Sequence, residues 1–237
     1  MTRAIGISRL GLAALPLVAL LAGALLATPA RAGCSDGPEA GVDWSKCEKR
    51  RLVLRERDLS KGNFARTDFS RSDLAGAKLV GADLTEANFE HARLAGADMT
   101  GAVLTKSNGD RANFTGALLT GADLSKVEMS RTDFTGADFT GANLQKAELG
   151  RANLTDSKLD GVDLTRAEIA RAVFAGASLA GADLTDAYTY LAHFESADLS
   201  QVKGLTQDQI EAACGNEETQ LPAGLTAPEA WPCEVEG

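Results

Sequence analysis

The twenty residues from Gly116 to Thr135, GALLTGADLSKVEMSRTDFT, decide the fold because a large apolar residue stands at every fifth position. These residues are Leu119, Leu124, Met129 and Phe134. An α-helix would spread such positions around its whole circumference, and a flat strand would place successive ones on opposite faces. A coil of four five-residue sides instead points all of them inward. The stretch therefore predicts one turn of a four-sided solenoid.

The same register continues through most of the chain. From Leu54 to Leu199 it has 30 positions, filled by 17 Leu, eight Phe, two Met and one Ile, with Gly109 and Thr189 as the exceptions. Two residues before each of these positions stands a second, mostly small residue, which is Ala at 20 of the 30. Each side would therefore bury one large and one small residue and expose the rest. We expect about 7.5 coils, or roughly 36 Å of rod at the usual strand spacing.

Several sides share one short motif. It reads GADLT at 81–85 and 181–185, GADLS at 121–125 and RANLT at 151–155. This pattern resembles the A-(D/N)-L-x-x motif of the pentapeptide-repeat family over residues 53–203. The resemblance implies an all-β fold, a right-handed quadrilateral parallel β-helix. Because a solenoid needs covered ends, we expect an N-terminal cap at 33–52 and a C-terminal helix and loop cap at 204–237.

Residues 1–32 have the features of an export signal. Arg3 and Arg9 lie before or at the start of the apolar stretch 10–27, and the triplet 30–32, Ala-Arg-Ala, fits a cleavage site. We expect cleavage after Ala32 and a periplasmic or secreted mature protein. The alternative is an uncleaved membrane anchor, because the apolar stretch just reaches spanning length.

Four cysteines flank the repeats. Cys34 and Cys47 precede them, and Cys214 and Cys233 follow them. Three pairings are possible, and only the local one avoids joining the two ends of a long rod. We therefore expect the disulfides Cys34–Cys47 and Cys214–Cys233. A metal site is disfavoured, since there is no C-x-x-C and no histidine near either pair.

The C-terminal segment contains a helix signal. Thr206 and Gln209 fit a capping box at the start of a short helix reaching Cys214, and Gly215 fits its C-terminal stop. We expect Ile210 and Ala213 to face the last coil. The proline-bearing remainder would be a loop held back by its disulfide.

Outward charges recur once per coil, at the same place on each turn of four sides. The arginine column has five arginines, with His91 in its second position: Arg71, Arg111, Arg131, Arg151 and Arg171. The column is a candidate binding strip for an anionic polymer or a lipid surface. The alternative is mutual neutralisation on a solvated surface, which a lysine column (Lys106, Lys126, Lys146, Arg166) beside a glutamate column (Glu128, Glu148, Glu168) favours.

Two irregularities lie on one face of this lattice. At Gly109 the stretch SNGD suggests a local turn or bulge, or a gap filled by Phe89 or Met129. Around Thr189 stand Tyr188 and Tyr190, followed by His193. These three side chains are a candidate partner site, or they mark a seam that the C-terminal tail covers. We favour the seam.

The sequence contains no catalytic constellation. His91 and His193, the only histidines, lie about five coils apart, and no phosphate loop or metal motif occurs. We expect no enzyme, no cofactor, no metal and no small-molecule substrate. The net charge of −9, which becomes −12 without the three signal arginines, excludes a strongly basic nucleic-acid binder.

We therefore expect a non-enzymatic exported scaffold, favoured as a monomer. It would present its surface to an unknown macromolecule, either a protein or a component of the cell envelope. The family resemblance implies one alternative: an acidic rod that mimics duplex DNA and inhibits a DNA-binding protein such as gyrase.

Overall fold

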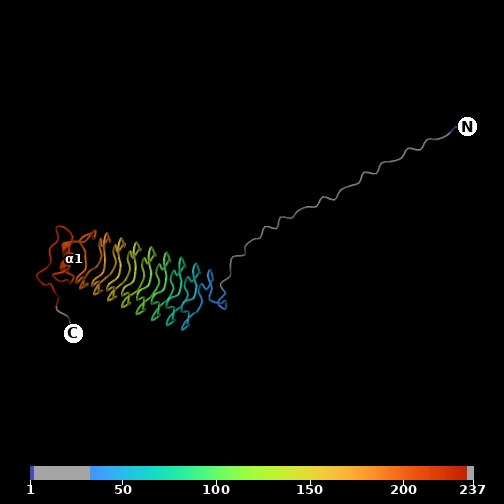
Figure 1. Cartoon of the computed structure of the whole chain (residues 1–237), viewed down its shortest axis with the longest axis horizontal. Coiled ribbons are helices and arrows are strands. Elements are labelled where there is room, and N and C mark those ends of the chain that lie inside the picture. Colours follow the sequence, from blue (N-terminus) through green and yellow to red (C-terminus); the bar gives the residue numbers. More distant parts are fainter. Residues whose placement is uncertain (3–32, 234–237) are drawn as a thin grey trace. The chain divides into compact units, whose positions relative to one another are not determined.

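A computed structural model describes residues 1–2 and 33–233 of the chain. Stacked coils form a rod along most of this second range (Figure 1). Parallel bridges join each position to the equivalent one on the next coil in an unbroken series, from Asp43–Asn63 to Asp183–Lys203. The chain from Asp43 to Lys203 thus makes eight coils. The predicted four-sided parallel solenoid is confirmed.

Each corner of the coil is a β-turn. At the corner formed by Gly116, the backbone N–H of Ala117 donates to the carbonyl of Phe114 at 2.9 Å, and Gly116 has a φ of +64°. A positive φ at the third residue is typical of a type II turn, which glycine adopts without steric cost. The five-residue register therefore places one left-handed residue at every corner.

Neighbouring coils are joined by backbone hydrogen bonds in both directions. The N–H of Leu119 donates to Asp138 on the next coil at 2.7 Å, and that of Leu118 donates to Ala97 on the coil before at 2.9 Å. The Asp or Asn of the motif caps the following turn, as when Asp123 accepts the N–H of Ser125 at 3.0 Å. This local bond explains why the outward motif position prefers a short acceptor side chain.

The interior follows the predicted pattern through both irregularities. Leu, Phe, Met and Ile of the register are buried from Leu54 onward. At Gly109 an added Cβ would lie 3.1 Å from Met129, so the Met129 side chain fills this space. The gap filled by Met129 is therefore confirmed, and no bulge forms. Backbone β-bridges pair Asn108 with both Asn88 and Glu128, and Gly109 does not have a positive φ.

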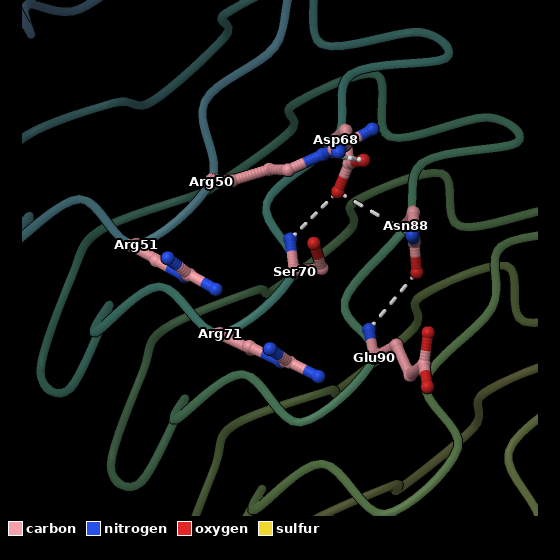
Figure 2. Close-up of a pocket in the computed structure, with 7 residues that line it drawn as sticks. All are labelled: Arg50, Arg51, Asp68, Ser70, Arg71, Asn88 and Glu90. Atoms are coloured by element: carbon pink, nitrogen blue, oxygen red, sulfur yellow. Dashed lines mark hydrogen bonds and ion pairs between the residues drawn. The ribbon is translucent and has the colours of Figure 1, made fainter.

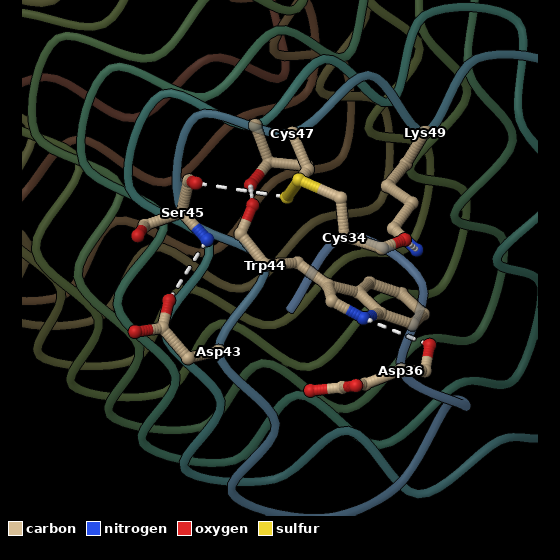
Figure 3. Close-up of a disulfide and its surroundings, with 8 residues drawn as sticks. Cys34, Asp36, Asp43, Trp44, Ser45, Cys47 and Lys49 are labelled. Carbon is tan, nitrogen blue, oxygen red and sulfur yellow. Dashed lines mark hydrogen bonds between the residues drawn. A yellow bond between two sulfur atoms is a disulfide. The ribbon is translucent and has the colours of Figure 1, made fainter. Parts of the chain in front are cut away.

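Regular coils begin before Val53. The register continues back to Trp44 and Lys49, both of which are buried (Figure 3). The Lys49 ammonium lies 3.6 Å from the Trp44 ring centroid and donates to the Cys34 carbonyl at 2.7 Å. Within the segment predicted as a cap, Asp43 already forms a parallel backbone β-bridge with Asn63 on the next coil. Lys49 interrupts the apolar pattern in the sequence. Burial lowers the pKa of its ammonium, and the cation–π contact and the hydrogen bond offset part of that effect.

The C-terminal end is covered by α1 (Gln207–Glu211) and the loop that follows. Thr206 and Gln209 form the predicted capping box, and Ile210 and Ala213 are buried as expected. The helix ends with Ala212 as its cap, earlier than predicted. Gly215 instead lies under the ring of Trp231, which an added Cβ would overlap.

Both predicted disulfides are present. Cys34 is bonded to Cys47 and Cys214 to Cys233, with Cα–Cα distances of 5.5 and 5.4 Å. Disulfides of this kind are typical of a non-reducing compartment. The predicted export signal, its cleavage site and the alternative membrane anchor lie outside the described residues. No helix among the residues that the structure describes has the length and apolarity to cross a membrane.

Candidate functional site

The faces of the rod differ in their corner residues. From Gly76 to Gly181, two neighbouring corners carry glycine at eleven of twelve positions, Asp156 being the exception. From Arg66 to Arg171, the other two carry Lys or Arg at ten of twelve, the exceptions being Glu86 and His91. We call the face between the glycine corners the glycine-edged face. The basic-edged face lies opposite, between the lysine column and the arginine column.

The basic corners are strained. Lys126 and Arg131 have φ values of +59° and +56°, close to the +64° of Gly116. An L-residue other than Asn or Asp loses about 1–2 kcal/mol in this conformation, whereas glycine loses almost nothing. The chain retains Lys and Arg at ten corners where glycine would satisfy the backbone. Strain that persists in this way is a reason to look for function nearby.

The arginine column follows one corner of the rod as predicted, and it is longer than the sequence analysis recognised. Arg51 extends it by one coil, with a φ of +56°. The middle of the column has acidic partners, since Asp110 lies 3.7 Å from Arg111 and 3.5 Å from Arg131. Within residues 33–233, Arg71, Arg151 and Arg171 form no ion pair with a carboxylate. Among the described residues, the column is therefore neutralised in its middle and has no ion pair at Arg71 or toward its C-terminal end.

One surface hollow, the N-terminal hollow, lies on the basic-edged face (Figure 2). Its centre is Asp68, which accepts from Arg50 at 2.5 Å, from the Ser70 N–H at 2.9 Å and from Asn88 at 3.3 Å. Burial opposes ionisation of Asp68, but the bonds from Ser70 and Arg50 outweigh it and lower the pKa. This hollow is largely occupied by its own hydrogen-bond network.

A second hollow, the C-terminal hollow, lies on the same face further along the rod. It is lined by Ser130, Arg131, Gly150, Arg151, Glu168, Ala170, Arg171, Tyr188 and Tyr190. The two tyrosine rings stack with centroids 6.2 Å apart and planes 16° apart. Their exposed fractions are 56% and 46%, so the tail does not cover them. The expectation that the tail hides these rings is wrong.

The structure separates the predicted cluster around Thr189. Thr189 is buried, and its hydroxyl donates to the Gln209 carbonyl of α1 at 2.7 Å, so it is part of the C-terminal seam. Tyr188 and Tyr190 point outward into the hollow. His193 lies on the neighbouring face, where its Nδ1 is 2.8 Å from Glu195. The seam and the exposed tyrosines are therefore two separate features.

The predicted glutamate and lysine columns lie on the basic-edged face and along one of its edges. Backbone β-bridges pair Glu128 with Glu148 and Glu148 with Glu168, so the glutamate column runs along the middle of the basic-edged face. No ion pair joins them to the lysine column in the described part of the chain, so the expected neutralisation is not seen there. Among the described residues, no group of three or more His, Cys, Asp or Glu side chains is placed to hold a metal ion.

The repeat model for pentapeptide repeats matches this chain in eight copies. The matched residues are 51–85, 82–121, 112–149, 147–186 and 167–203. The chain belongs to the pentapeptide-repeat family. Its fold is accordingly the right-handed β-helix of this family. No curated protein matches the chain.

Solved pentapeptide-repeat structures resemble this one. A trypsin-treated variant of QnrB1, a plasmid-mediated fluoroquinolone resistance protein, is 20% identical, with a TM-score of 0.51 over 79% of this chain and 93% of its own. HetL, a pentapeptide-repeat protein involved in heterocyst differentiation regulation in Nostoc sp. strain PCC 7120, is 29% identical over 78% and 91%, with a TM-score of 0.27. At so low an identity the likeness to QnrB1 shows the fold alone.

The sequence predicts the arginine column and the tyrosines but not the hollow that joins them. The floor of this hollow is formed by Ser130, Gly150 and Ala170, which are small at positions where the preceding coils carry Glu90 and Asp110. These positions are one coil apart in the sequence and directly precede the arginines. An alignment of the chain with itself, shifted by one coil, contains this signal.

Proposed function

We propose that this chain is an exported, non-enzymatic scaffold that holds a macromolecular partner on its basic-edged face. The partner is a protein or a component of the cell envelope. The observation that carries the proposal is the coincidence on this face of two surface hollows, a strained basic edge and an exposed tyrosine pair. Exposed aromatic and arginine side chains are the residue types that dominate binding energy at interfaces.

Export is supported at the first described residue after the predicted cleavage site. The Asp36 carboxylate packs directly against Gly33, at the place where a Cβ of residue 33 would lie. The Gly33 N–H donates to the Asp43 carbonyl at 3.0 Å. Cleavage after Ala32 would create an ammonium at Gly33, beside the Asp36 carboxylate. The mature N-terminus would then form an ion pair within the cap.

The alternative of an acidic duplex mimic has less support. The acidic column on a side face, Asp83, Asp123, Asp163 and Asp183, is interrupted by Val103 and Asn143 and ends at Lys203. Two disulfides also fit poorly with a target such as gyrase in a reducing compartment.

The test places a photoreactive amino acid at Lys146, on the basic edge, or at Lys158, on the glycine-edged face. Both lysines are exposed and lie less than one coil apart along the chain. In cells expressing the full chain, crosslinks to a partner are expected from position 146 and not from position 158. The recovered protein should be outside the cytoplasm and begin at Gly33 on N-terminal sequencing. Equal crosslinking from both faces, or an intact N-terminus in the cytoplasm, would refute the proposal.

A further inference from the structure

The C-terminal hollow has an open floor that the fold does not require. Its floor consists of Ser130, Gly150 and Ala170. Gly150 does not have a positive φ, and an added Cβ would meet its neighbours at 3.6–3.8 Å, which is ordinary contact. A larger residue would therefore fit the backbone. The small floor leaves room for a ligand close to the main chain.

The two walls of the hollow differ in chemistry. On one side, Arg131, Arg151 and Arg171 repeat at the strand spacing of about 4.8 Å. Arg131 pairs with Asp110, which also pairs with Arg111, whereas Arg151 and Arg171 form no ion pair within residues 33–233. On the other side, Glu168 faces the hollow and continues the glutamate column. The walls thus offer guanidinium donors for carboxylates and carboxylate acceptors for hydroxyl groups.

The end of the hollow is aromatic. Tyr188 and Tyr190 stack at a centroid distance of 6.2 Å and expose about half of their surface. Tyrosine combines an apolar ring with a hydroxyl group, so it packs against a flat apolar surface while the hydroxyl stays solvated. The C–H face of a sugar ring is a surface of this kind.

We propose that the C-terminal hollow binds an acidic polysaccharide with carboxylated sugars, lying along the rod axis. The carboxylates would contact Arg151 and Arg171, the hydroxyls Glu168, and a ring Tyr188 or Tyr190. An acidic peptide fits less well, because its carboxylates would match the arginines but it would offer neither ring hydroxyl groups to Glu168 nor the C–H face of a sugar to the tyrosines. This inference rests on the proposed function, because it assigns the ligand of the same face.

The experiment uses the oxidised full chain and two probes, polygalacturonate and alginate, with neutral dextran and poly-glutamate as comparisons. Wild-type protein is expected to bind the two acidic polysaccharides, with an affinity that falls as salt rises. The variant Arg151→Gly with Arg171→Gly should lose at least about tenfold in affinity, because charge-assisted hydrogen bonds disappear. Glycine suits both corners, so the variant should fold normally by circular dichroism.

A relocated-charge variant is the matched control. It combines the two glycine substitutions with Gly116→Arg and Gly136→Arg, which restore the net charge on the opposite face in open space. Binding should stay lost if the hollow is the site. Restored binding, unchanged affinity of the double variant, or absence of wild-type binding would overturn the inference. Tighter binding of poly-glutamate than of the acidic polysaccharides would also overturn the inference. That result would indicate a peptide partner for the basic-edged face, so the proposed function would stand.

Discussion

The basic-edged face and the glycine-edged face are built on the same backbone. Their corners have nearly the same φ, as Lys126 at +59° and Gly116 at +64° illustrate. One pair of corners satisfies this conformation with glycine, and the other pair bears long cationic side chains in spite of the strain. The difference teaches that the fold sets the backbone of every corner but does not choose its side chain. The basic edge is therefore a property of the surface, maintained at a cost in stability.

All four faces of the rod depend on one hydrophobic register in the interior. A charge at a buried position of this register should therefore unfold all of them. Leu144 is fully buried on a coil in the middle of the rod. Leu144→Asp should unfold the protein, because a buried carboxylate without a partner costs several kcal/mol. Thermal unfolding followed by circular dichroism measures the effect.

The adjacent residue supplies the control for this variant. Gln145 points outward, so Gln145→Asp introduces the same charge and should change the free energy of unfolding by about 0.5 kcal/mol or less. Similar losses at the two positions would contradict the inward and outward assignment on which both faces depend.

Exchanging corner residues between the two faces sharpens the comparison. Arg151→Gly and Arg171→Gly should each leave the free energy of unfolding unchanged or raise it by up to about 1 kcal/mol, because relief of strain exceeds the added chain entropy. Gly116→Arg and Gly136→Arg should each lower it by a similar amount. Urea unfolding of the four variants measures this, and destabilisation by the glycine substitutions would show that the arginines stabilise the fold.

The smallest expected effect concerns acid. Asp138, on the glycine-edged face, has a lowered pKa because its carboxylate accepts the Thr140 hydroxyl and N–H and lies 3.6 Å from Lys158. A lowered pKa stabilises the folded state above the unfolded value of 3.8, and this stability is lost as the pH falls through the folded value. Asp138→Asn should therefore reduce stability at pH 7 by less than about 1 kcal/mol.

The same variant should reduce the loss of stability on acidification below about pH 4. Unfolding curves at a series of pH values test this, with Arg151→Gly as a control that should leave the slope unaltered. An unchanged slope in Asp138→Asn would mean that the pairing of Asp138 does not contribute.

The sequence predicted the coils because Leu and Phe recur in register, which is local information. It did not predict where the coils begin, since Lys49 is acceptable at an inward position only through its contact with Trp44. Thr189 was recognised as irregular, but its partner, the Gln209 carbonyl, is a tertiary contact. The C-terminal hollow was missed for a related reason. It depends on the small size of Gly150 and Ala170, which leave a depression only because stacking places them next to each other on successive coils.

Every coil from Asp43 to Lys203 has 20 residues. The position of a residue within this 20-residue repeat therefore determines the face to which its side chain points. Removing one whole coil would shorten the rod and leave every face in place. Removing a single side, such as 121–125, would preserve the hydrophobic register but turn everything downstream by a quarter of a revolution. The arginine corner of the last coils would then stack on the lysine corner of the first, and the two hollows would open on adjacent sides. Small changes in chain length can thus rotate one hollow about the other without altering a residue in either.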